Sequence, residues 1–277
     1  MIVIADSGST KCNWQLVDDS GSVRRVQSRG INAVLQRPDE VEALLRETFA
    51  EPVQADALHF YGAGCGERYP EQSARLREAL ARYFPAARIA VESDLMGAAR
   101  ALLGGRAGIA CILGTGSNSC YYDGVRNTPP LGWVLGDEGS GTYIGRQLVG
   151  NLLKGLCDES LRRLFFEEER LDYDEIIRRV YREGMANRFL ASFTRFVARH
   201  IDRPELDELV CEAFRAFVRR NLAHYPADAE VSALGGVACH FERQLRHVLA
   251  TEGLRAGRIV ETPDEGLLNY HIWNRSE

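Results

Sequence analysis

Two short stretches of this chain share one pattern, residues 4–12 (IADSGSTKC) and residues 112–120 (ILGTGSNSC). In each stretch an apolar strand enters a small, hydroxyl-rich turn, and a second strand follows. Backbone N–H groups in such Gly, Ser and Thr turns can face an anion, and the small side chains let phosphate oxygens come close. One strand–glycine–strand hairpin is common. Two in register at Ile, Gly, Ser and Cys predict a duplicated phosphate clamp, made by two related halves that close on one nucleotide.

The composition indicates a globular protein with a small-molecule ligand. With 277 residues, 45% of them hydrophobic, the chain can build the cores of two ordinary domains. A net charge of −5 argues against a nucleic-acid or anionic-membrane surface. The first predicted strand meets an Asp with no basic segment or long apolar run around it, so we expect no signal peptide and a cytoplasmic protein. The seven cysteines include no C-x-x-C pair, which predicts neither disulfides nor structural zinc.

The predicted elements repeat one theme twice. The first half is expected to contain strands at 2–6, 12–18, 22–27, 56–61 and 87–92 and helices at 38–49, 71–84 and 94–104. The second half is expected to contain strands near 108–113 and 117–123, a further candidate strand at 125–134, a mostly helical region at 140–224, strands at 229–234 and 257–260, and helices at 237–251 and 264–273. This order predicts an α/β fold with a mixed sheet flanked by helices, made twice. The glycine-rich residues 104–108 predict the boundary between the two domains.

Two charged residues adjoin the first turn. Asp6 ends the first predicted strand, where a carboxylate can face a Mg²⁺ ion that bridges nucleotide phosphates, usually through water. The alternative is a turn residue that accepts local N–H bonds. Lys11, one of only two lysines, can supply a point charge near the phosphates or can be an exposed hairpin lysine.

Asp94 stands where a predicted strand ends and a helix begins, the place where α/β sheets bind ligands. One interpretation is a base that orients and deprotonates a substrate hydroxyl beside the γ-phosphate. The other is a helix cap, because Asp is among the best capping residues. Glu92 and Ser93 are the nearest alternatives, and a cap formed by Ser93 would leave Asp94 available for chemistry.

Three more loops follow predicted strands. Residues 133–141 (WVLGDEGSG) contain acids that can accept hydrogen bonds from polyol hydroxyls and a tryptophan with an apolar face. Their alternative role is an acidic cap of the next helix. Gly235 and Gly236 either let the backbone approach a flat ligand such as adenine or form only a tight turn. Asn32 can bind a sugar amide or hydroxyl. Walker A, G-x-G-x-x-G, H-E-x-x-H and G-x-S-x-G patterns are absent from the sequence.

These motifs resemble those of a known superfamily. Residues 6–11 (DSGSTK), 113–117 (LGTGS) and 234–237 (LGGV) resemble, in the same order, the first phosphate, second phosphate and adenosine motifs of the actin-like ATPases. Within that superfamily the chain is similar to the BadF/BadG/BcrA/BcrD ATPase family, specifically its N-acetylglucosamine kinase-like branch. The segments that carry this second resemblance are Asn32, Asp94, residues 132–133 (GW), 135–141 (LGDEGSG) and 262–267 (TPDEGL).

The resemblance implies an ATP:sugar phosphotransferase that uses ATP and Mg²⁺. It implies two ribonuclease-H-like domains, 1–106 and 107–277, with a cleft between them that closes on the substrate. The second domain would carry a helical insertion at 140–224, and the tail 264–277 would pack back on the first. The implied roles are a base at Asp94, a metal site at Asp6, phosphate binding by Ser7, Gly8, Ser9, Thr10, Lys11, Gly114, Thr115, Gly116 and Ser117, adenosine binding by Gly235 and Gly236, and sugar binding by Asn32, Gly132, Trp133 and Asp137.

Two departures narrow the choice within the superfamily. The chain lacks the zinc-binding Cys/His cluster of the repressor/kinase branch and the Cys-bearing segment by which dehydratase-activating ATPases hold an iron–sulfur cluster. We therefore expect an amino-sugar kinase, with N-acetylglucosamine as the first candidate substrate. Two other hypotheses are an ATP-driven activator of a partner protein and a non-catalytic sugar or nucleotide sensor. The sequence leaves open which sugar is used, which hydroxyl is phosphorylated and whether the chain forms a homodimer.

Overall fold

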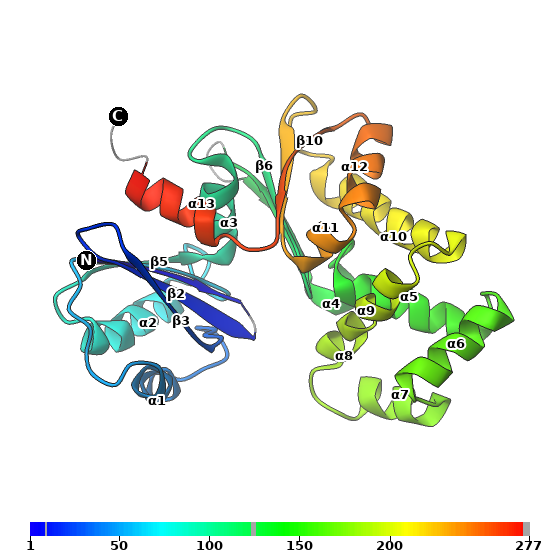
Figure 1. Cartoon of the computed structure of the whole chain (residues 1–277), viewed down its shortest axis with the longest axis horizontal. Helices are drawn as coiled ribbons and strands as arrows, with labels where there is room; N and C mark the ends of the chain where they lie inside the picture. The colour runs from blue at the N-terminus through cyan, green and yellow to red at the C-terminus, as the bar shows by residue number, and fades with distance from the viewer. Residues whose placement is uncertain (9, 123–125, 274–277) are drawn as a thin grey trace. The chain divides into compact units, whose positions relative to one another are not determined.

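The computed structural model describes residues 1–8, 10–122 and 126–273 (Figure 1). The chain divides into two compact units, Met1–Gly105 with Pro263–Glu277, and Arg106–Thr262. Each unit contains one five-stranded mixed sheet flanked by helices.

The sheet of the first unit has the strand order β3-β2-β1-β4-β5. Its strands are β1 (Ile2–Ser7), β2 (Lys11–Val17), β3 (Val23–Arg29), β4 (Ala57–Gly62) and β5 (Arg88–Ser93). The first three form an antiparallel meander, and β1, β4 and β5 are parallel. The helices are α1 (Pro38–Thr48), α2 (Pro70–Tyr83), α3 (Asp94–Leu103), α13 (Asp264–Leu268) and the π-helix η2 (Asn269–Trp273).

Alternation along β1 sends side chains into two cores. Val3 and Ala5 belong to a core that includes Trp14 and Phe84, whose rings stack at 6.0 Å. Ile4 faces the other side of the sheet. Successive residues of a strand point to opposite faces, so both faces of this sheet are covered by apolar side chains. The sheet is therefore buried on both sides, and its strand ends are left for ligand contacts.

The C-terminal segment completes the second of these cores. Leu267 and Leu268 pack with Ile4 and Tyr61. The helix α13 approaches α3 so closely that a Cβ atom on Gly266 would lie 2.2 Å from the carbonyl oxygen of Ala101. Glycine is thus required at this crossing, because any side chain would push the two helices apart.

The second unit repeats the topology of the first. Its strands β6 (Ile109–Leu113), β7 (Ser117–Tyr121), β8 (Arg126–Thr128), β9 (Glu230–Leu234) and β10 (Arg255–Val260) are ordered β8-β7-β6-β9-β10, with the same antiparallel and parallel pairings. The helices are α4 (Gly132–Leu135), α5 (Gly141–Lys154), α6 (Glu159–Glu169), α7 (Tyr173–Tyr181), α8 (Ala186–Ser192), α9 (Thr194–Arg199), α10 (Pro204–Phe217), the π-helix η1 (Val218–Leu222), α11 (Gly236–His240) and α12 (Glu242–Thr251). The predicted α/β fold with two mixed sheets is confirmed.

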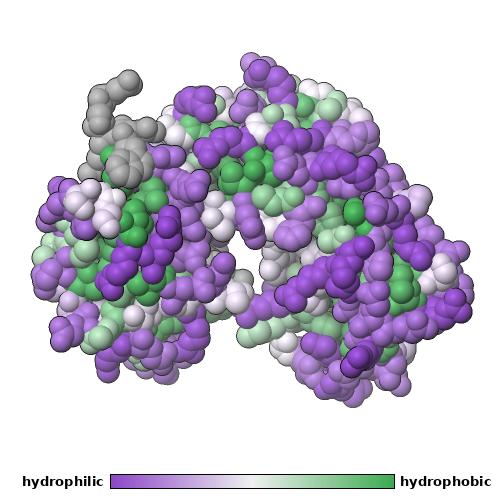
Figure 2. Space-filling model, in the orientation of Figure 1, coloured by the Kyte–Doolittle hydropathy of each residue, from purple (hydrophilic) through white to green (hydrophobic). Residues whose placement is uncertain are grey.

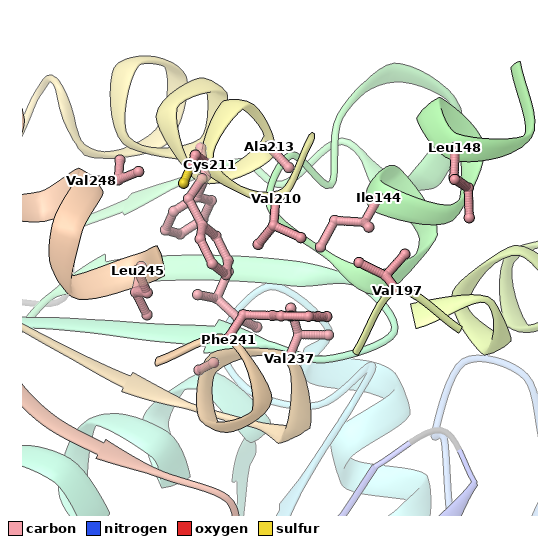
Figure 3. Close-up of a cluster of buried hydrophobic side chains, with 14 of the residues drawn as sticks. Ile144, Leu148, Val197, Val210, Cys211, Ala213, Val237, Phe241, Leu245 and Val248 are labelled. Atoms are coloured by element: carbon pink, nitrogen blue, oxygen red, sulfur yellow. The ribbon is translucent and has the colours of Figure 1, made fainter. Parts of the chain in front are cut away.

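The core of the second unit lies where α5, α10, α11 and α12 meet. In Figure 3, Ile144 of α5, Val210 of α10 and Val237 of α11 point toward one another, and all three are buried. On the face shown in Figure 2, hydrophilic residues predominate and hydrophobic ones form small, scattered patches. The apolar residues are thus used mainly inside the units.

Three predicted elements were wrong in extent. The candidate strand at 125–134 is confined, within the described residues, to Arg126–Thr128, and Gly132–Leu135 is a helical turn instead. The two prolines at 129 and 130 explain this, because proline has no N–H group to pair with β7. The predicted helix 237–251 is interrupted at Phe241, and the predicted helix 264–273 changes to a π-helix after Leu268.

Candidate active site

In the first unit the predicted site residues gather at one edge of the sheet. Ser7, Gly62 and Ser93 are the last residues of the parallel strands β1, β4 and β5, and the register pairs them side by side. Asp6 precedes the first of these residues, and Asp94 follows the third. The carboxyl ends of parallel strands are where α/β sheets bind ligands. The sequence therefore places two carboxylates at the edge that is best suited to a substrate.

The structure separates the two roles considered for Asp94. Ser93 is the N-cap of α3, and its hydroxyl accepts a hydrogen bond from Met96 N at 3.1 Å. Asp94 is the first helical residue, half-buried, and its Oδ1 accepts from Leu95 N at 2.8 Å. Burial raises the pKa of Asp94 above its usual range. Its carboxylate is thus not needed as the cap and has a raised proton affinity, as a general base requires.

Asp6 lies in a site that contains more carboxylates than cations. The pKa of Asp6 is raised to about 7, first by burial and then by the carboxylates of Asp264 and Asp94, while Lys11 lowers it. Asp264 also has a buried Oδ1 without a hydrogen-bond partner among the described residues. Carboxylates that repel one another in this way would be stabilised by a hard cation such as Mg²⁺. Asp264 belongs to the 262–267 segment that carries the family resemblance, but it was given no site role, because it lies far from Asp6 along the chain.

The first clamp is only partly available to a ligand. The Ser7 side chain is fully buried, donates to Ile31 O at 2.9 Å and accepts from Ile31 N at 2.7 Å. Its hydroxyl therefore joins the end of β1 to the loop after β3 and is not directed at a phosphate. Gly8 N donates to Lys11 O at 3.0 Å and closes the hairpin, while Thr10 and Lys11 are exposed at its tip. The remaining predicted residue, Ser9, lies outside the described residues.

Asn32 lies near this edge of the sheet, in the loop that Ser7 contacts through Ile31. Its Oδ1 accepts hydrogen bonds from Val34 N at 3.0 Å and Leu35 N at 3.2 Å. This Asx turn fixes the side chain and leaves its amide N–H groups as the part that can donate to a ligand.

The second clamp is supported by the start of α5. Gly114 N donates to Gly116 O at 3.0 Å, which closes the turn. Gly141 N donates to Gly114 O at 2.8 Å, and the Thr142 hydroxyl donates to Thr115 O at 2.6 Å. These bonds use the carbonyl groups of the turn and direct them toward the helix. The turn is therefore held by a rigid element.

Asp137 lies directly against the second clamp. Its Oδ1 accepts from Ser117 N at 3.4 Å, and a Cβ atom on Gly116 would lie 3.0 Å from its Oδ2. The residue has φ of 56°, a left-handed conformation that is strained for a non-glycine residue. The pKa of Asp137 is raised to about 6, mainly by burial and also by Glu138, while the Ser117 N–H and Arg146 lower it. The sugar role expected for Asp137 came from the family resemblance, and the sequence did not indicate this contact with the clamp.

Gly132 and Trp133 form the first half of α4, in a loop that we call the 130–137 loop. The loop closes on itself, because Asp137 N donates to Pro130 O at 3.1 Å. Trp133 is half-buried, whereas Val134 and Leu135 are 64% and 69% exposed. The exposed apolar residues stand beside the two predicted sugar contacts, so this loop offers an apolar surface next to polar groups.

Gly235 joins the adenosine motif to the second clamp. It has φ of 123°, and a Cβ atom there would lie 2.4 Å from Leu113 O and 3.3 Å from Gly114 N. No other residue type fits at this position. Gly236, in contrast, has no atom nearer than 4.0 Å to such a Cβ, the nearest being His240 Nδ1. The second unit thus brings together the second clamp, the adenosine motif and Asp137.

Neither a metal-binding cluster nor a membrane-spanning helix is found in the part of the chain that the structure describes. No group of three or more His, Cys, Asp or Glu residues there is arranged to bind a metal ion. A Mg²⁺ ion held by Asp6 would therefore need further oxygen ligands from water or a nucleotide. Among the described helices, none combines the length and apolar character that a membrane span requires.

Comparison with known proteins identifies the family. A crystal structure from Porphyromonas gingivalis, described as a "Putative N-acetylglucosamine Kinase", is 42% identical to this chain, covers 99% of both chains and superposes with a TM-score of 0.92. The chain belongs to the N-acetylglucosamine kinase-like branch of the BadF/BadG/BcrA/BcrD ATPase family. No protein-family model matches the chain.

Two further proteins are more distantly similar to this chain. A protein from Chromobacterium violaceum with the same description is 20% identical over 97% of the chain and 98% of its own, with a TM-score of 0.75, which shows the shared fold. The N-acetylmuramic acid/N-acetylglucosamine kinase of Clostridium acetobutylicum is 36% identical over 110 residues. That match spans 35% of this chain and 35% of the relative.

Proposed function

We propose that this protein is an ATP-dependent sugar kinase, which transfers the γ-phosphoryl group to a hydroxyl of N-acetylglucosamine or a related amino sugar. The observation that carries the proposal is at the start of α3. Ser93 caps the helix there, so the carboxylate of Asp94 is available to act as a base. Full-length identity of 42% with a protein described as an N-acetylglucosamine kinase supports the substrate class.

In this proposal Asp94 accepts the proton of the attacking sugar hydroxyl. Its raised pKa suits the task, because a carboxylate of higher proton affinity is a better base as long as it remains ionised at the working pH. Asn32, with its carbonyl fixed in the Asx turn, donates its amide to the sugar. Gly132, Trp133 and Asp137 contribute the other sugar contacts.

The nucleotide is assigned to the two turns and the glycine pair. Thr10 and Lys11 with Gly8, and Gly114–Ser117, bind the phosphates, and Gly235 with Gly236 bind the adenosine. A Mg²⁺ ion would be held at Asp6, where it would neutralise phosphate charge. The excess of carboxylates around Asp6, including Asp264 with its buried oxygen, fits a divalent cation bound through oxygen ligands.

The test is a coupled assay of ADP release with ATP and Mg²⁺ across hexoses, hexosamines and muramic acids. We expect N-acetylated amino sugars to stimulate ADP release, together with formation of a phosphorylated sugar detected by mass spectrometry. ADP release that is independent of every sugar would contradict the kinase proposal and favour an ATPase that acts on a partner protein.

A further inference from the structure

The 130–137 loop contacts α5 through one side chain that no sequence motif selects. Arg146 of α5 donates through Nη1 to the carbonyl oxygen of Trp133 at 2.7 Å and more weakly to that of Val134 at 3.4 Å. The helix α4 is only four residues long, so its last carbonyl groups have no partner within the helix. Arg146 therefore caps the carboxyl end of α4 and attaches the loop to a longer helix.

Arg146 and the part of α5 that carries it are themselves held in place. The guanidinium carbon of Arg146 lies 5.1 Å from the centre of the Tyr143 ring, a cation–π contact one turn earlier on the same helix. One residue before Arg146, α5 packs so closely on α8 that a Cβ atom on Gly145 would lie 1.9 Å from Leu190 O. Because α5 cannot shift relative to α8 at this point, the backbone that carries Arg146 is fixed by rigid packing.

Arg146 also acts on the other end of the loop. The charged groups that affect Asp137 are Glu138, which follows it, and Arg146, which is the cation. Glu138 is itself paired with Arg220 at 3.0 Å and accepts from Asn221 Nδ2 at 3.2 Å. The positive charge of Arg146 thus favours the ionised form of a carboxylate that burial disfavours.

We propose that Arg146 is a positioning residue for phosphoryl transfer, which holds the 130–137 loop so that Trp133 and Asp137 are presented to the sugar in a fixed arrangement. The inference rests on the proposed function, since that function assigns these two residues to the sugar. Arg146 touches neither substrate nor nucleotide in this account. It acts through the two carbonyl groups and through its charge.

The first test is kinetic. Arg146→Met should raise KM for N-acetylglucosamine by about ten-fold or more, because a loop displaced by an ångström loses well-placed contacts. KM for ATP should stay close to that of the wild type. Arg146→Lys keeps the charge but can offer only one compact donor, so it should recover part of the loss. Arg162→Met is the matched control, because Arg162 also makes a cation–π contact on a helix of this unit, at 5.5 Å from Phe166, but touches no predicted site residue.

The second test uses pH and separates positioning from general stability. Removal of the Arg146 charge should raise the pKa of Asp137 further, so the acidic limb of the kcat/KM profile should move to higher pH by roughly half a unit or more. Arg146→Lys should leave the limb near its wild-type position. In an Asp137→Asn background, Arg146→Met should no longer move it.

A third measurement needs no activity. The peptide bonds after Trp133 and Leu135 suit chymotrypsin, and release of the loop in Arg146→Met should speed cleavage there relative to wild type and Arg162→Met. If the wild-type enzyme is sugar-dependent but Arg146→Met keeps the wild-type KM, acidic limb and cleavage rate, this inference alone is overturned. Equal increases of both KM values with a lower melting temperature would also overturn it, because that pattern marks a folding defect. Sugar-independent ADP release by the wild type would instead overturn the proposed function.

Discussion

From the sequence alone, either Ser93 or Asp94 could cap α3. The hydrogen bond from Met96 N to Ser93 Oγ assigns the cap to the serine. Substitutions at these two positions should therefore affect different properties, turnover at Asp94 and stability at Ser93.

Asp94→Asn should lower kcat by roughly 10²–10⁴-fold, because an amide cannot accept the hydroxyl proton that a general base takes. Folding and both KM values should change little, since Ser93 keeps the cap. Ser93→Ala should lower the free energy of unfolding by about 1 kcal/mol, the usual effect of a lost cap, and should retain most of the activity. Thermal melting and ADP release, measured on both variants, check the pair. Near-normal kcat in a folded Asp94→Asn enzyme would remove Asp94 from the chemistry.

Asp6 gives a prediction about pH and stability. Its pKa is raised from 3.8 to about 7, so between these values the folded state binds more protons than the unfolded state. Ionised Asp6 therefore destabilises the fold, and stability should fall as pH rises from about 4 to about 7. At pH 8 the neutral variant Asp6→Asn should have a higher free energy of unfolding than the wild type, by up to about 4 kcal/mol for a shift of this size. At pH 4 the two free energies of unfolding should be nearly equal.

The same variant should lose the Mg²⁺ dependence of activity if Asp6 holds the ion. Addition of Mg²⁺ and ATP should stabilise the wild type at pH 8 more than Asp6→Asn. A variant whose melting temperature follows that of the wild type at every pH would show that Asp6 is not held in this unfavourable environment.

At the scale of elements, the two glycines after β9 should respond differently to one added methyl group. Gly235→Ala forces a Cβ atom to within 2.4 Å of Leu113 O in a left-handed conformation, so it should lower the free energy of unfolding by at least about 1–2 kcal/mol. Gly236→Ala has room and should fold normally. If the pair binds adenosine, Gly236→Ala should still weaken ATP binding, measured by calorimetry. Unchanged ATP affinity in Gly236→Ala would argue against an adenosine site there.

Most strands and helices could be predicted from local patterns, because both sheets begin with an apolar strand, a small turn and a second strand. The failures are of two kinds. The two prolines ended β8 early. Within η2, His271 Nε2 lies 2.7 Å from Tyr61 OH. Such a contact joins residues that are far apart in sequence, so no periodicity could reveal it.

The candidate site was predictable as residue types at strand ends but not as contacts. The sequence shows that Asp6 ends one strand and Asp94 follows another, and parallel pairing of the central strands brings both to one edge. It does not show that Asp264 joins them, that Ser7 is used by Ile31, or that Asp137 lies on the second clamp. These depend on tertiary packing, in which loops of different elements meet.

For the whole molecule, ligand binding should report on both sets of site residues. A ligand that binds only the folded state stabilises it by about 2.7 kcal/mol at a hundred times its dissociation constant. We expect ATP with Mg²⁺ and N-acetylglucosamine each to raise the melting temperature. Asn32→Ala should abolish most of the sugar effect and leave the ATP effect, because its amide is assigned to the sugar alone. Loss of both effects in that variant would indicate a misplaced site or a damaged fold.

The crossing of Gly266 over Ala101 has a consequence for how this protein is made. Residues 263–273 complete the first unit, yet the ribosome synthesises them only after the whole of the second unit. Until then the apolar surface that Leu267 and Leu268 cover, around Ile4 and Tyr61, is left open on the growing chain. The N-terminal unit therefore cannot finish folding first, as early domains often do during synthesis. The nascent chain should consequently depend on chaperones for longest at its oldest end.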